Sequence, residues 1–220
     1  MKRSLILVFL ATVAAVLALS VRMYFPFADA KGSLTFASAP AHDSDAAARE
    51  IAAAMRSAIG VADIRKSLEG IDWIEYVSAR EIYPDRIEVV VRPKTIIGSV
   101  LDGGRYFGVS DSGEVVRAGL GAPRFPLVEG RGGAEALPSL PGELAAVAGY
   151  DAEFVLARRV DMIRWDLVLR RGNQDLLLRL PPERVLETLE KIAGLRLPFE
   201  SVSVLDARAE PEVFVMPRAR

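Results

Sequence analysis

A single apolar run near the N-terminus constrains this chain most. Residues 5–21 contain no charged side chain and follow the basic pair Lys2 and Arg3. A run of this length falls within the range of about 17–25 residues that crosses a bilayer as a helix. The pattern predicts a signal anchor over residues 1–30 that passes once through the inner membrane. Its N-terminus would stay in the cytoplasm and the rest of the chain would lie in the periplasm.

Two alternatives to the anchor follow from the same residues. Ala28-Asp29-Ala30 fits the small-x-small pattern of a signal-peptide cleavage site, although the bulky residues before it suit cleavage poorly. The second alternative is a buried core helix, which the basic start and the extreme N-terminal position disfavour. Both targeting interpretations place the remaining chain outside the cytoplasm.

Composition excludes several classes of function. The 28 basic and 29 acidic residues give a formal net charge of -1, which provides no general attraction for a nucleic-acid backbone. The absence of cysteine removes disulfides, thiolate catalysis and sulfur-ligated metals. His42 is the only histidine and lies in a polar loop, so it is a poor candidate for the histidine of a catalytic triad. We therefore expect no enzyme activity, no catalytic residue, no cofactor, no metal and no small-molecule substrate.

Residues 31–95 predict a small α+β domain. A short strand is expected at 33–36, followed by helices at 46–59 and 61–71 with apolar residues at helical spacing. The period then changes to two, which predicts an antiparallel hairpin of strands 73–83 and 87–91 around Pro84-Asp85. This order of elements predicts a three-stranded sheet with two helices on one face.

Residues 96–220 predict a second domain that is mainly antiparallel β with covering helices. Strong β segments are expected at 154–171 and 174–180, joined by the Gly172-Asn173 turn. A helix is expected over 182–194, with proline in its first turn and Val185, Leu186, Leu189 and Ile192 on one apolar stripe. Further β segments are expected at 105–111, 114–118, 125–128, 202–208 and 212–216, and a weak helix within 141–150.

One group of basic and aromatic residues allows two interpretations. Arg158, Arg159, Arg164 and Trp165 could form a nucleic-acid surface. Alternation along the strands favours a solvated β face instead, with all four side chains on the exposed side.

Several motifs occur in the order found in one protein family. The helix over 64–70 leads to Trp73, and the hairpin has Tyr83-Pro84-Asp85 at its turn before a return strand of alternating valines. Both features resemble the POTRA domain of the bacterial cell-division family FtsQ/DivIB. Trp73 is expected to hold the helix end onto the sheet, and the Tyr83, Pro84 and Asp85 turn to fix the hairpin register. Later segments are similar to the family's β domain: 109–116, 125–130, 165–172, 204–208 and 213–215.

The resemblance implies a scaffold of the divisome at the division septum, anchored in the inner membrane. Its partners would be membrane proteins of FtsB and FtsL type, and of FtsK, FtsW and FtsI type. A partner strand is expected to add to a sheet edge near residues 204–216. POTRA units also serve protein export and envelope assembly, which is the alternative. The candidate partner-binding residues are Asp206, Arg208, Ala209, Val213, Phe214 and Val215.

Overall fold

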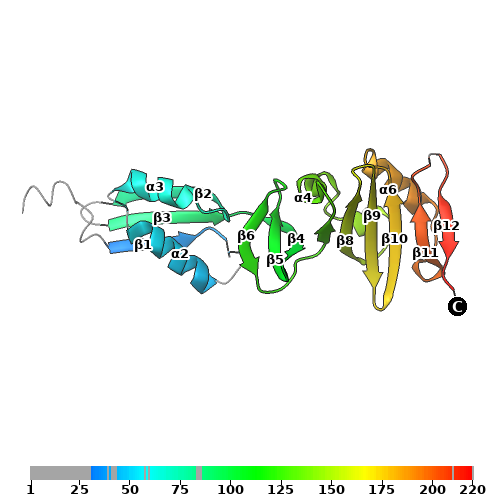
Figure 1. The fold of residues 1–220 in the computed structure, drawn as a ribbon, viewed down its shortest axis with the longest axis horizontal. Helices are drawn as coiled ribbons and strands as arrows, with labels where there is room; N and C mark the ends of the chain where they lie inside the picture. Colours follow the sequence, from blue (N-terminus) through cyan, green and yellow to red (C-terminus); the bar gives the residue numbers. More distant parts are fainter. Residues whose placement is uncertain are drawn as a thin grey trace, which may run out of the picture. The chain divides into compact units, whose positions relative to one another are not determined.

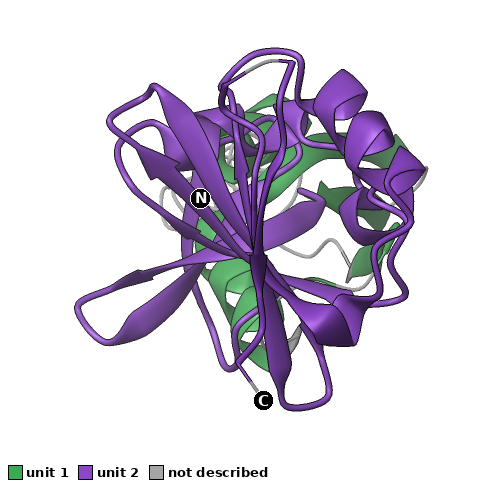
Figure 2. Cartoon of the chain, turned by 90° about the vertical axis from the view of Figure 1, so that its right-hand side faces the viewer, with its two compact units in different colours: residues 1–93 green, residues 94–220 purple. Residues whose placement is uncertain are grey.

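A computed structural model describes residues 31–38, 40, 44–56, 58, 60–82, 86–209 and 211–219. The predicted anchor over residues 1–30 and the turn residues Tyr83, Pro84 and Asp85 lie outside this set. Within the described ranges, no helix combines the length and the apolar character needed to cross a membrane. The chain divides into two compact units, Met1–Pro93 (unit 1) and Lys94–Arg220 (unit 2), coloured separately in Figure 2. The predicted domain ranges, 31–95 and 96–220, remain predictions.

Unit 1 has the predicted order of strand, helix, helix, strand and strand (Figure 1). In its sheet β3 is central, with β1 parallel to it on one side and β2 antiparallel on the other. Buried residues of both helices, such as Ile51 and Leu68, join the buried valines of β3 in one core. The elements are β1 (Lys31–Phe36), α2 (Ser44–Arg56), α3 (Val61–Glu69), β2 (Ile74–Ile82) and β3 (Arg86–Pro93).

Trp73 connects three of these elements. It lies directly before β2 and is only 2% exposed. Its indole Nε1 donates a hydrogen bond of 2.7 Å to Oε2 of Glu50 in α2, and its ring centroid is 6.4 Å from that of Phe36 in β1. The described contacts therefore join Trp73 to α2 as well as to the sheet.

Unit 2 is built on one nine-stranded sheet with the order β12-β11-β10-β9-β8-β7-β4-β5-β6. The sheet is mixed, because β4–β7, β7–β8 and β10–β11 are parallel pairs. The chain crosses over between them through short helices or loops, which single-strand periodicity does not reveal. The elements are β4 (Ile96–Asp102), β5 (Arg105–Ser110), β6 (Val115–Leu120), β7 (Leu127–Glu129), α4 (Gly133–Ala136), η1 (Leu137–Ser139), α5 (Leu144–Val147), β8 (Glu153–Val160), β9 (Arg164–Arg171), β10 (Gln174–Leu180), α6 (Val185–Gly194), η2 (Phe199–Ser201), β11 (Val202–Asp206) and β12 (Phe214–Pro217).

The predicted β segment 154–171 is two strands, and Trp165 lies on the core face of the second. A tight turn separates β8 from β9, with positive φ at Asp161 and Met162. Trp165 pairs with Arg159 across the hairpin and is fully buried. Its face is the core face, shared with buried residues of β9 and β10 such as Leu167 and Leu178. The expectation that Trp165 lies on the exposed side is therefore wrong.

Helix α6 also starts later than predicted. Its first residue is Val185, and Arg184 precedes it in a left-handed conformation with φ of 58°. Pro182 thus lies before the helix and not in its first turn. Leu186 is 50% exposed, whereas Thr188 is buried and donates from Oγ1 to the Arg184 carbonyl at 2.9 Å. The buried stripe is Val185, Thr188, Leu189 and Ile192.

Candidate interaction surface

Strand β12 ends the sheet of unit 2 and forms its C-terminal edge (Figure 1). Among the described residues its one strand neighbour is β11, to which it pairs antiparallel. All four residues of β12 are exposed, with Phe214 at 57%, Val215 at 45% and Met216 at 56%. An exposed edge strand offers unpaired backbone groups to a further strand. This edge can therefore pair with a strand of another chain.

Two hydrogen bonds show which side of β12 each backbone N–H and C=O group faces. The Arg218 N–H donates to the Ser201 carbonyl at 2.9 Å, so Arg218 faces β11. The Ala207 N–H donates to the Arg179 carbonyl of β10, so its neighbour Asp206 faces β12. Backbone groups alternate sides along a strand, so Phe214 and Met216 face β11. Val215 and Pro217 then face the free edge, where Val215 supplies both N–H and C=O and Pro217 only C=O.

A row of charges of alternating sign crosses the sheet toward this edge. The row occupies adjacent register positions in β7, β8, β9, β10 and β11. Arg158 bonds to Glu129 at 2.6 Å, and Arg179 lies 3.6 Å from Asp206. The row therefore ends at Asp206, next to the edge strand. Its members are Glu129, Arg158, Asp166, Arg179 and Asp206.

An apolar stripe runs beside this charged row on the same face. In β7 to β11, each member lies two residues from the charged residue of the same strand and is half-buried. The member in β12, Met216, is exposed. Residues of the opposite face, such as Ala157 and Leu178, are buried in the core with α6. The face away from the helices therefore combines apolar contact area with ordered charges and continues onto β12. The stripe consists of Leu127, Leu156, Val168, Leu177, Val204 and Met216.

Asp206 is the most strongly held carboxylate of this surface. Nε and Nη2 of Arg208 donate to its two oxygens at 2.7 and 2.6 Å. The hydrogen bond from Arg208 is the main cause that lowers the pKa of Asp206, and its partial burial opposes that shift. The ionised carboxylate is thus the stable form at neutral pH.

We expect the Arg208→Gln substitution to raise the pKa of Asp206 toward the ordinary aspartate value. Because the folded pKa is depressed, the stabilisation by Asp206 is present above the unfolded pKa and lost as the pH falls through the folded one. Carboxyl-detected NMR titration of both proteins measures this shift. An unchanged pKa would contradict the assignment to Arg208.

The structure brings together four of the six candidate partner-binding residues. Asp206 and Arg208 form an ion pair beside Phe214 and Val215 of β12. Ala209 is exposed in the connection to β12. Val213 precedes β12 and packs, partly buried, against the core, so its predicted place within the strand is wrong.

Other members of the surface are not apparent from the sequence. Arg164 bonds to Asp166 at 2.9 Å within β9 and reinforces the charged row. Alternation in 174–180 places Arg179 on the face of the strand away from Leu178. Only the parallel pairing of β10 with β11 brings Arg179 to Asp206. Long-range register, which single strands do not encode, decides these contacts.

The described residues offer no group of three or more histidine, cysteine or acidic side chains able to hold a metal ion. Beside the hairpin of β2 and β3, Glu88 bonds to Arg80 at 2.5 Å. Asp85 lies outside the described residues. The geometry near this hairpin is that of a surface ion pair.

No family model matches this sequence. Several curated proteins named cell division protein FtsQ are similar to it. The chain is 27% identical over 165 residues to the protein of Rhizobium meliloti (strain 1021), covering 72% of this chain and 52% of that protein. The protein of Caulobacter vibrioides (strain NA1000 / CB15N) is 26% identical over 161 residues, covering 72% and 53%. That of Rhizobium radiobacter is 29% identical over 146 residues, covering 64% and 66%.

The chain spans about half the length of the first two of these relatives. The motifs around Trp73, Trp165 and Asp206 lie in both units of the fold. These similarities, 26–29% identity over 64–72% of the chain, support the FtsQ/DivIB family of bacterial cell-division proteins.

Proposed function

We propose that this protein is a non-enzymatic scaffold of the divisome, anchored in the inner membrane at the septum by residues 1–30. Its periplasmic part binds membrane proteins of FtsB and FtsL type during septum formation. Relatives named as cell-division proteins support the process, and the apolar N-terminal run supports the anchor. Proteins of FtsK, FtsW and FtsI type are further proposed partners.

The observation that carries the binding role is the free edge of β12. A partner segment adds there as a further strand. It accepts a hydrogen bond from the Val215 N–H and donates hydrogen bonds to the Val215 and Pro217 carbonyls. Pro217 limits the donors at this edge, which restricts pairing to partners in one register. The exposed side chains of Phe214 and Met216 then contact the partner on the face away from the helices.

Charge gives the same edge its selectivity. Arg208 is exposed while bound to Asp206, and Arg179 lies 3.6 Å from the same carboxylate. An incoming carboxylate is attracted to these two guanidinium groups, whereas an unpaired incoming cation gains little. Electrostatic complementarity of this kind selects partners more than it adds affinity. We therefore expect the bound partner segment to carry an acidic residue close to its added strand.

The Val215→Pro substitution tests the edge. Proline removes the one outward N–H of β12 and leaves the bonds to β11 intact, because Val215 does not donate to β11. We expect recovery of the FtsB-like and FtsL-like partners to fall about tenfold, on the scale of a hydrogen bond lost at a desolvated interface. The measurement is mild crosslinking in the protein's own cells, purification of the anchored chain and quantitative mass spectrometry.

Val215→Ala is the matched control, because it shortens the same side chain and keeps the N–H. Its partner recovery should remain close to that of the unchanged protein. Full partner recovery with Val215→Pro would contradict pairing of the partner with the β12 edge. Recovery of export or envelope-assembly proteins alone would replace the divisome proposal with the alternative pathway.

A further inference from the structure

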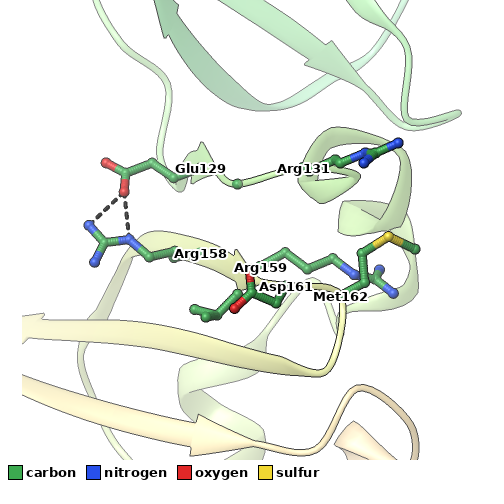
Figure 3. Close-up of a pocket in the computed structure, with 8 residues that line it drawn as sticks. Glu129, Arg131, Arg158, Arg159, Asp161 and Met162 are labelled. Atoms are coloured by element: carbon green, nitrogen blue, oxygen red, sulfur yellow. Dashed lines mark hydrogen bonds and ion pairs between the residues drawn. The ribbon is translucent and has the colours of Figure 1, made fainter.

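A second feature of unit 2 lies away from the β12 edge, at the turn between β8 and β9. It is a cavity of about 540 Å³ between the end of β7, the following loop and this turn. Figure 3 shows the Glu129–Arg158 pair on one side, and Arg131, Arg159 and Met162 on the other. The lining residues are Glu129, Gly130, Arg131, Arg158, Arg159, Val160, Asp161 and Met162.

Two of the three arginines in this pocket have no carboxylate partner among the described residues. Arg158 is neutralised by Glu129, with 2.6 Å between Nη2 and Oε2. Arg131 is exposed and Arg159 half-buried, and neither forms an ion pair within the described part of the chain. Two guanidinium groups are thus available to an incoming anion, and guanidinium binds carboxylates through charge-assisted hydrogen bonds.

Arg159 is fixed in place by the core. Its guanidinium carbon lies 5.3 Å from the ring centroid of the buried Trp165. Its Nε is buried and has no hydrogen-bond partner among the described residues. Such a stacked guanidinium loses little side-chain freedom when it binds a ligand. The pocket therefore presents a positioned cation together with a buried donor that remains unsatisfied.

The charge of the lining selects the kind of anion. The three arginines are opposed by Glu129 and Asp161, which leaves one formal positive charge. A single carboxylate balances this charge, whereas a doubly charged phosphate would leave an excess negative charge beside Glu129 and Asp161. Met162 is 53% exposed and its neighbour Ile163 is 66% exposed. These side chains offer apolar contact beside the charges, as an acidic residue next to an apolar one would require.

We infer that this pocket binds an acidic peptide segment of a partner protein. One carboxylate of the segment lies between Arg131 and Arg159, and an adjacent apolar side chain packs on Met162 and Ile163. The segment differs from the strand that adds to β12, because the two sites lie on different strands of the sheet. The partner protein thus contacts unit 2 through two independent elements, or two partners bind at once.

The test uses the full chain in detergent and a short fluorescein-labelled peptide with Leu-Asp-Leu at its centre. We expect saturable binding by fluorescence anisotropy. The Arg131→Gln substitution should weaken it about tenfold, because a hydrogen bond to a charged group is lost. Replacing the peptide's aspartate with asparagine should weaken binding to a similar extent. Arg131 is exposed, so this variant is expected to fold normally.

Arg105→Gln is the matched control, since Arg105 is exposed at the start of β5 in the same sheet and the substitution removes the same charge. It should leave peptide binding unchanged, as should Val215→Pro at the other site. Equal weakening by Arg105→Gln and Arg131→Gln would overturn the proposal. Binding that fails to saturate by about 1 mM peptide would also overturn it. So would Arg131-dependent binding to phosphatidylglycerol vesicles without binding to the peptide.

Discussion

Replacing Trp165 with alanine is expected to lower the free energy of unfolding of unit 2 by about 3–5 kcal/mol. The Trp165 side chain has 0% solvent exposure and is among the largest of the fully buried side chains. It lies between Arg159 of β8 and Leu180 of β10 in the sheet register. Its removal leaves a large cavity that neighbouring strands cannot close. Urea unfolding followed by circular dichroism measures the loss.

Trp165→Phe provides the control for this prediction. Phenylalanine keeps most of the buried ring, and it removes an indole N–H that has no partner among the described residues. The expected loss is therefore much smaller than for alanine. A Trp165→Ala protein within about 1 kcal/mol of the unchanged chain would contradict the buried position of this side chain.

Replacing Gly130 with alanine is the second substitution with a large expected effect. Gly130 has a φ of 88°, and a Cβ atom there would lie 2.0 Å from the backbone oxygen of Arg159. The left-handed conformation costs a residue with Cβ about 1–2 kcal/mol, and forcing β8 aside adds an overpacking cost of about 1–3 kcal/mol. We expect unit 2 to lose about 2–5 kcal/mol in unfolding free energy.

Gly132→Ala separates the two causes. Gly132 also has a positive φ, of 69°, but nothing lies within 4 Å of its added Cβ. It should lose about 1–2 kcal/mol, from the backbone conformation alone. Gly130→Ala should in addition weaken binding of the Leu-Asp-Leu peptide, because the displaced backbone carries Arg159. Equal losses for the two glycines would show that β7 and β8 do not approach each other so closely.

A change that preserves the fold separates the two proposed binding sites experimentally. Partner recovery through Val215 should survive a fold-preserving change at the pocket such as Arg131→Gln. Loss of both activities in that variant would mean that one partner segment spans the two sites.

Local patterns predicted much of the fold. The strand-helix-helix-strand-strand order of unit 1 follows from the change of period at Trp73 and is confirmed by the structure. The Gly172-Asn173 turn and the paired strands around it are also as predicted. The turn at Asp161 and Met162 is not evident from the sequence, because Asp161 is followed by Met162 and not by the glycine that usually marks such a turn. The turn does not decide the orientation of Trp165, since Arg159 and Trp165 share a face both across the hairpin and under simple alternation.

The candidate site was predicted in part. The edge near 204–216 was expected from its position and from the resemblance, and the structure places β12 at the end of the sheet. Val213 was wrongly assigned to the strand, since the chain becomes extended against β11 only from Phe214. The outward direction of Val215 needed the hydrogen bond from Arg218 to Ser201, which no pattern within residues 212–216 contains.

The sequence by itself determined the apolar N-terminal run, most helices and strands, and the resemblance to FtsQ proteins. These depend on contacts between residues near in the chain, whose periodicity is visible in one dimension. The tertiary structure alone decided the mixed strand order, the charged row that ends at Asp206, and the pocket formed by Arg131 and Arg159. Each of these requires the register of strands that are distant in sequence, and that register is set by the packing of the whole core.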